Sequence, residues 1–395
     1  MPEGNVASVC VPIGQKTPLS APEAVSLSRM TLTNFRNYSS LRLFLDEAPV
    51  VLTGRNGSGK TNILEAISLL VPGRGLRRSP LSDLQNRASE TPWAVSIDLR
   101  TETGALTIGT GRDNAVNDSD GERRVVQVDG KPMRKQSLLA EHLALAWIVP
   151  EMDRLLVEGS STRRKFLDRL IYSFDTAHGG RVRAYERALR ERLCLLREGR
   201  ADRRWLDALE NELAQKSVAI AAARRTFTER LQRAIDGGGS VFPHAALAVF
   251  GLPEDLLADR PALLVEDALR EAFVRARADD AQRGTSSVGA HRSDLKVQHA
   301  AKNCPAELCS TGEQKALMVA IMLAYVRLVL QHRGMTPLFL LDDCVAHLDD
   351  VRRDALFEEV LALGVQAWFT GTDAEAFAAI SPYAQMFDVT GGVIR

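Results

Sequence analysis

Apolar runs and helical repeats alternate near both ends of the chain. Residues 25–45 alternate apolar and polar positions, which predicts strands, and the apolar run at 48–53 predicts a further, buried strand. Apolar residues at helical spacing over 62–70 predict a helix directly after that run. Residues 93–130 contain strand-like fragments around a polar turn cluster at 112–122, which indicates a second, small sheet.

The middle of the chain has a different pattern. Long helical repeats dominate residues 151–284 and predict a helical arm, whereas short strands and helices alternate again over 285–395. The clearest buried strand there is 337–341. We therefore expect one α/β domain, built from 25–150 and 285–395, that is interrupted by a mostly helical second lobe. Residues 1–24 contain several prolines and predict a flexible leader.

Composition narrows the protein class only broadly. The 395 residues are 45% hydrophobic and 25% charged, which excludes a collagen-like or wholly disordered chain. Fifty Lys and Arg balance fifty Asp and Glu, so the total charge favours neither nucleic acid nor membrane. Residues 181–233, however, hold 14 basic against 8 acidic side chains. This local excess predicts either a solvated helix face or a nucleic-acid surface.

The cysteine and hydropathy patterns indicate in which cellular compartment the protein is expected. The five cysteines are scattered without a CxxC pair, which argues against a disulfide framework or a zinc site. The most apolar stretch, 316–330, is interrupted by Arg327 and is short for a membrane span, so a buried helix is the better interpretation. We expect a cytoplasmic protein without a membrane partner.

A glycine-rich segment between the strand at 48–53 and the helix at 62–70 matches the phosphate-loop pattern GxxxxGK[ST]. Its residues are Gly54, Arg55, Asn56, Gly57, Ser58, Gly59, Lys60 and Thr61. Backbone N–H groups would surround phosphates, Lys60 would face the β- and γ-phosphates, and the Thr61 hydroxyl would bind Mg²⁺. The alternative is a glycine loop with a surface lysine.

The strand at 337–341 ends in two carboxylates, Asp342 and Asp343. Asp342 would hold Mg²⁺, directly or through water, and Asp343 would act as the general base on the attacking water. With Lys60, these two are the candidate catalytic residues.

A third motif precedes the apolar stretch 316–330. Its candidate nucleotide contacts are Ser310, Thr311, Gly312 and Glu313, whose hydroxyls and N–H groups would favour an anion at a helix N-terminus. An ordinary capping box is the alternative. Phosphate loop, this signature segment and an Asp-ended strand follow one another as in ABC-type ATPase heads.

Several further blocks, spread over 25–395, form a more specific pattern. They are Asn34–Tyr38, Gly54–Ala66, Pro150–Glu151, Glu158–Gly159, Arg163–Asp168, Gly289–Leu295, Ser310–Leu317, Leu341–Asp343 and Leu348–Asp349. Together these blocks resemble the bacterial RecF family of DNA replication and repair proteins. The chain departs from the family pattern at Ala290 and Ser293, and at His347, which replaces an acid.

The resemblance implies ATP and Mg²⁺ as cofactors and an ATP-dependent homodimer that joins head to head. It also implies binding to double- and single-stranded DNA at gaps and junctions, and cooperation with RecO and RecR to load RecA. ATP hydrolysis would be slow, a weak DNA-stimulated ATPase used as a switch. By the same resemblance, Arg36 and Asn37 are candidate nucleotide contacts, with a surface turn as the alternative.

Other ATPases explain the motifs less well. A transporter-type ABC subunit would carry Ser310 much closer to Thr61, and an SMC or Rad50-like head would fill the gap with heptad repeats that this chain lacks. A nucleoside kinase leaves the signature segment unexplained. A DNA-binding scaffold without enzymatic activity is the alternative from another functional class.

Overall fold

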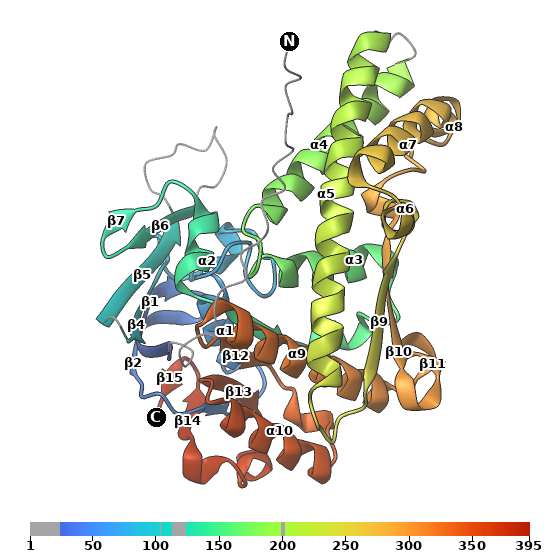
Figure 1. The fold of residues 1–395 in the computed structure, drawn as a ribbon. Coiled ribbons are helices and arrows are strands. Elements are labelled where there is room, and N and C mark those ends of the chain that lie inside the picture. The colour runs from blue at the N-terminus through green and yellow to red at the C-terminus, as the bar shows by residue number, and fades with distance from the viewer. Residues whose placement is uncertain (1–23, 103, 113–123, 199–201) are drawn as a thin grey trace, which may run out of the picture.

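The structure, a computed structural model, describes residues 24–102, 104–112, 124–198 and 202–395. The expected leader lies outside the described residues except for Ala24, and so does all of the predicted turn cluster at 112–122 except Arg112. Figure 1 shows that most of the strands gather on one side of the molecule and that a group of helices projects from the other.

The first sheet is antiparallel and has the strand order β2-β1-β4-β5-β6-β7. Its strands are β1 (Ser26–Phe35), β2 (Tyr38–Phe44), β4 (Ala94–Thr101), β5 (Gly104–Arg112), β6 (Arg124–Val128) and β7 (Lys131–Pro132). The strands predicted within 25–45 and 93–130 are confirmed. They form one sheet rather than two, because β1 pairs with β2 on one edge and with β4 on the other.

The second sheet contains the phosphate-loop strand and has the order β15-β14-β3-β13-β12-β8. Its strands are β3 (Val50–Thr53), β8 (Leu145–Ile148), β12 (Leu338–Leu341), β13 (Ala367–Gly371), β14 (Gln385–Thr390) and β15 (Val393–Ile394). Neighbouring strands are parallel except for the β14–β15 pair. The helices that precede or follow these strands in the chain are α1 (Lys60–Ser68), α2 (Leu139–His142), α9 (Thr311–Arg333) and α10 (Asp350–Leu363). The predicted α/β fold is thus confirmed, and its sheet is mixed.

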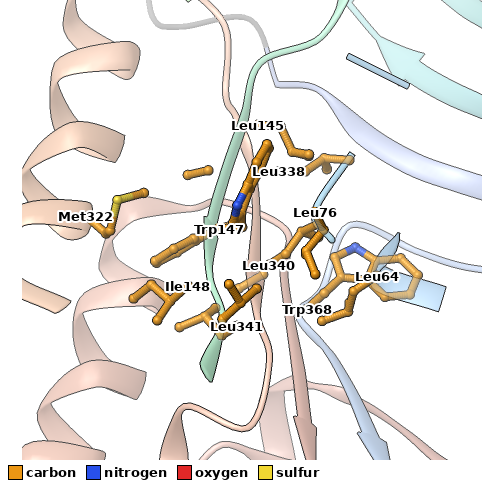
Figure 2. Close-up of a cluster of buried hydrophobic side chains, with 14 of the residues drawn as sticks. Leu64, Leu76, Leu145, Trp147, Ile148, Met322, Leu338, Leu340, Leu341 and Trp368 are labelled. Atoms are coloured by element: carbon orange, nitrogen blue, oxygen red, sulfur yellow. The ribbon is translucent and has the colours of Figure 1, made fainter. Parts of the chain in front are cut away.

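The parallel strands lie at the centre of the hydrophobic core. Trp147, Leu340 and Trp368 occupy one row across β8, β12 and β13, and all three side chains are buried (Figure 2). Strands covered on both faces consist of continuous apolar runs, which is why β3 and β12 carry no polar alternation. Parallel strands also end at the same edge of their sheet, so the residues that follow β3 and β12 come close together.

Helix α9 passes through this core. It begins at Thr311, earlier than the predicted start at 316, because Ser310 caps its first turn. It is the one helix of the described residues that is long and apolar enough to cross a membrane, yet 72% of its apolar window is buried inside the protein. The helix therefore acts as a core element, as the arginine within its apolar stretch predicts.

Six helices, which we call the helical lobe, occupy the part of the chain expected to be mostly helical. They are α3 (Ser160–Ile171), α4 (His178–Glu198), α5 (Arg203–Asp236), α6 (Leu252–Asp259), α7 (Ala262–Arg275) and α8 (Arg277–Arg283). Helix α5 spans 34 residues, packs along α4 at its outer part and reaches α9 (Figure 1).

A small sheet lies at the base of the helical lobe, in the order β11-β10-β9. Its strands are β9 (Ala245–Phe250), β10 (Asp294–His299) and β11 (Cys304–Pro305). The expectation of a mostly helical segment missed β9. Its partner β10 follows only after three further helices, so no hairpin signal accompanies it in the sequence.

A buried charge cluster holds the outer part of the helical lobe together. The fully buried Arg192 on α4 forms ion pairs with Glu210 on α5 at 2.8 Å and Asp280 on α8 at 2.7 Å. It also donates to the carbonyl of Phe273 at the end of α7 (2.8 Å). A buried guanidinium in an apolar lobe requires such partners, so one side chain connects four helices.

We expect Arg192→Leu to lower the free energy of unfolding by about 3 to 5 kcal/mol, because it leaves the buried Asp280 carboxylate without its cation, whereas Glu210 keeps its ion pair with Arg277. Arg275→Leu is the matched control, since Arg275 is 70% exposed on α7 and, within the described part of the chain, forms an ion pair only with Glu271. Its effect stays within about 0.5 kcal/mol. Urea unfolding of both variants measures the difference, and equal small losses would contradict this role of Arg192.

Candidate nucleotide site

The phosphate loop turns from β3 directly into the N-terminus of α1. Gly59 has a φ of 117°, and a Cβ there would lie 2.5 Å from Asn37 Nδ2 and 2.6 Å from the Tyr38 hydroxyl. Only glycine fits this position. Asn37 Nδ2 donates to the Ser58 carbonyl (3.0 Å), and Asn62 Nδ2 donates to Asn37 Oδ1 (2.7 Å). The predicted contact residue Asn37 thus braces the loop from behind.

Lys60 lies over its own loop. Its Nζ donates to the carbonyls of Gly54 at 2.6 Å and Arg55 at 3.0 Å, and the residue is only 8% exposed. Burial lowers the pKa of Lys60, while the nearby carboxylates of Asp343 and Asp342 oppose that shift. Two neutral carbonyl acceptors therefore hold the ammonium group beside the loop. Anionic phosphate oxygens would bind it more strongly and draw it away from these carbonyls.

Thr61 and Asp342 meet at the edge of the parallel sheet. Thr61 Oγ1 donates to Asp342 Oδ1 at 2.9 Å, and Thr370 Oγ1 donates to the same oxygen at 2.7 Å. Burial raises the pKa of Asp342, and the two hydroxyl donors counteract the rise. The structure thus brings together the hydroxyl and the carboxylate that the sequence assigns to Mg²⁺.

Asp343 lies beside this pair in a left-handed backbone conformation, with φ 48°. Its backbone N–H donates to Thr370 Oγ1 at 2.9 Å. Thr370 at the end of β13 therefore connects the Asp342 carboxylate with the backbone of Asp343. Sequence reasoning missed Thr370, although the apolar run before it predicts a strand that ends at the same sheet edge.

A cavity of about 250 Å³ lies between the loop and these strand ends. The loop and α1 line one side, and Asp342, Asp343 and Thr370 line the other. Arg77 and Glu151 also line it and were not among the predicted site residues. Of these two residues, only Glu151 could have been found from the sequence, because it belongs to the Pro150–Glu151 block that follows a buried strand.

Arg36 is not among the residues that line the cavity. Its guanidinium forms two hydrogen bonds of 2.8 Å to the Glu65 carboxylate and one of 2.7 Å to Ser79 Oγ. Glu65 is 1% exposed and also pairs with Arg77 at 3.6 Å. In this structure Arg36 fixes the position of α1.

The signature segment Ser310–Glu313 is also absent from the cavity lining. Ser310 and Glu313 form a capping box at the start of α9, as the capping-box alternative for this motif predicts. The Lys302 ammonium and two hydrogen bonds from Ser310 lower the pKa of Glu313 to about 2. Ser310 and Thr311 are exposed, which leaves the end of the helix open to another molecule.

Comparison with known proteins identifies the family. The family model described as RecF/RecN/SMC N terminal domain matches residues 26–395. The chain is 46% identical over 375 residues to the DNA replication and repair protein RecF of Agrobacterium fabrum, covering 94% of this chain and 98% of that protein. This chain belongs to the RecF family. The RecF of Brucella suis is 44% identical over 376 residues, with 94% and 96% covered.

Solved structures extend the RecF comparison to the fold. A structure described as the recombination mediator protein RecF-ATPrS in the RecFOR pathway aligns with a TM-score of 0.81 at 23% identity, covering 95% of this chain and 99% of that one. An Smc head domain from Pyrococcus furiosus aligns with a TM-score of 0.52 at 16% identity, covering 94% and 95%. The chain therefore has the fold of RecF and is less similar to an SMC head.

We expect Asp342→Asn to stabilise the nucleotide-free protein at pH 7, and the gain to shrink as the pH falls towards 4. Because the pKa of Asp342 is raised on folding, ionisation costs the native state stability as the pH rises, whereas asparagine keeps the Oδ1 acceptor and carries no charge. Thermal unfolding across this pH range measures the effect. The control is Asp373→Asn, at an exposed carboxylate that accepts a hydrogen bond from the Glu375 backbone N–H, and equal pH profiles would contradict the assignment.

Proposed function

We propose that the chain binds ATP with Mg²⁺ at the phosphate loop. The observation that carries this proposal is the meeting of Thr61 and Asp342 beside the loop, at 2.9 Å. The residues also fit the ligand, since Ser58 Oγ is buried without a hydrogen-bond partner among the described residues and lies within the loop. Mg²⁺ prefers few protein oxygens and takes its other ligands from phosphate and water. Consistent with that, no group of three or more His, Cys, Asp or Glu in the described chain suits a metal.

Asp343 would serve as the general base in a slow hydrolysis that returns the protein to its free state. It lies next to Asp342 on the cavity wall, and its strained backbone fixes the carboxylate at the strand end. Mg²⁺ would offset charge on the phosphates, while Lys60 and the loop N–H groups would orient them. ATP would act as a switch between two association states.

The signature segment would act on the nucleotide of a second copy. Ser310 and Thr311 are exposed at the N-terminus of a 23-residue helix, and neither lines the cavity of its own chain. A helix N-terminus favours an anion, so the γ-phosphate held by one head would attract this end of the other. ATP would thereby join two heads face to face.

The joined heads would bind DNA. The names of the sequence relatives place them in DNA replication and repair. Solved relatives are described as recombination mediators of the RecFOR pathway. We extend this to the present chain, with RecO and RecR as partners and RecA as the protein to be loaded. The basic excess between 181 and 233 supports phosphate contacts along α4 and α5.

Two of the basic residues within 181–233 are buried and therefore cannot contact DNA. Arg224 is 3% exposed, pairs with Asp168 at 2.8 Å and donates to the Ala290 carbonyl at 2.7 Å. Arg192 is fully buried. Both serve packing of the lobe, whereas Arg203, Arg204 and Arg225 keep access to solvent.

We expect Ser310→Arg to bind ATP but fail to associate, because the bulky side chain at the exposed start of α9 keeps the partner's nucleotide from approaching the backbone N–H groups there. Lys60→Ala loses a charge-assisted contact to phosphate and binds ATP about tenfold to a hundredfold more weakly. An equal mixture of the two variants regains ATP-driven association, since one composite site then combines an intact loop with an intact signature.

Sedimentation velocity with and without ATP measures this association. Asp202→Arg is the matched control: it removes the N-cap of α5, which is worth about 1 kcal/mol, and should leave association unchanged. Association of Ser310→Arg at the parent level would reduce the segment to a helix cap.

We expect the triple variant Arg203→Ala, Arg204→Ala, Arg225→Ala to bind duplex DNA more weakly with every sequence, while ATP binding persists. The slope of log affinity against log salt should become shallower by about 1 to 3, since each lost phosphate contact removes about 0.9. The control is Arg260→Ala with Arg275→Ala, on the exposed surface near α7. A fluorescence titration of DNA binding at several salt concentrations measures this slope. A slope equal to that of the parent would show that these three arginines do not contact DNA.

A further inference from the structure

Two cysteines lie next to each other immediately before the signature segment. Cys304 is in β11, and Cys309 follows a single 3-10 turn that brings it back towards the strand. Both thiols donate to one acceptor, the Pro305 carbonyl, at 3.5 Å from Cys304 and 3.6 Å from Cys309. The two sulfur atoms therefore meet at one oxygen atom.

Both cysteines are free thiols with partial exposure to solvent. Small oxidants can therefore reach them. The other two described cysteines lie elsewhere, Cys194 exposed on α4 and Cys344 buried after β12. The sequence gives no warning of the pair, because four residues between two cysteines match no standard redox or metal motif.

The same short segment is connected to the first turn of α9. The Gln314 side-chain amide donates to the carbonyls of Ala306 at 3.1 Å, Glu307 at 3.4 Å and Cys309 at 2.9 Å. Lys302, just before the pair, forms an ion pair with Glu313 of the capping box. Any displacement of Cys309 is thus transmitted to its covalent neighbour Ser310 and to the start of the helix.

We propose that Cys304 and Cys309 close to a reversible disulfide under oxidising conditions and that this bond weakens ATP-driven association of the heads. The effect on association rests on the function proposed above for Ser310, whereas bond formation does not. Closing the bond removes both thiol donors from the Pro305 carbonyl and draws Cys309 towards Cys304. The carbonyls that accept hydrogen bonds from Gln314 then move together with Cys309. Ser310 is displaced with them and leaves the position that the partner's phosphate requires.

The oxidant we assign is a small-molecule disulfide such as glutathione disulfide. One cysteine thiolate attacks a sulfur of that disulfide, which forms a mixed disulfide and releases one small thiolate. The second cysteine thiolate then attacks the protein sulfur of the mixed disulfide, closes the ring and releases the second small thiolate. The two cysteine protons end on the two released thiols, so the protein loses two electrons and the oxidant gains them.

Bond formation is tested on the full chain with glutathione disulfide as the oxidant. We expect peptide mapping without reductant to join Cys304 to Cys309, with a peptide mass two hydrogens below that of the reduced form, whether or not the exposed Cys194 carries a glutathione adduct. Burial raises the pKa of Cys309, so closure should accelerate from pH 7 to pH 9 as more thiolate forms. Cys304→Ser and Cys309→Ser should each stop at a single glutathione adduct at this pair, and Cys194→Ser should close as the parent does. A parent that accumulates two separate adducts would overturn the proposal.

The effect on association is measured by sedimentation with ATP. Oxidised parent should need about tenfold higher protein concentration to associate than reduced parent, and a dithiol reductant should restore it. Cys304→Ser and Cys309→Ser should associate equally before and after oxidation. A closed disulfide with unchanged association would overturn the regulatory role. If reduced parent fails to associate with ATP, the proposed function fails, while the mass readout still decides whether the bond forms.

Discussion

The hydrogen bond between Thr61 and Asp342 connects residues 281 positions apart and is the constraint on which the site depends. Neither residue can reach the other unless β3, β13 and β12 lie side by side in one parallel sheet. The buried row of Trp147, Leu340 and Trp368 is part of the core that fixes this order (Figure 2). The site is thus a consequence of core packing, because the carboxyl ends of parallel strands meet at one edge.

The helical lobe is inserted between the two halves of the head, and arginine side chains join it to the second half. Arg224 on α5 connects Asp168 on α3 with the Ala290 carbonyl before β10. Arg163 on α3 pairs with Asp294 at the start of β10 at 2.6 Å. Strand β10 leads through β11 to the signature segment, so the contacts that orient the lobe also lie on the path to Ser310. This connection gives a structural reason why the DNA contact proposed for the lobe and the ATP site proposed for the head would influence each other.

The parts of the site that follow a local pattern could be predicted from the sequence. Gly54–Thr61, Asp342 and the α/β order depend on neighbouring residues and on the ends of apolar strands. Thr370 and Arg77 were not assigned, because the sheet order and the loop packing decide which strand end and which loop residue reach the cavity. The arginines of the lobe show the same limit. Arg224 looks like a surface residue until its partner Asp168, 56 positions earlier, is placed beside it.

The central claim is that Thr61 and Asp342 together hold the Mg²⁺ of a bound ATP. The most direct measurement is the ATP affinity of the parent and of Asp342→Asn, each with Mg²⁺ and with a chelator in its place. The account predicts that Mg²⁺ strengthens binding to the parent by about tenfold or more, and that the variant keeps the Mg²⁺-free affinity but loses this gain. A variant that responds to Mg²⁺ as the parent does would contradict the account.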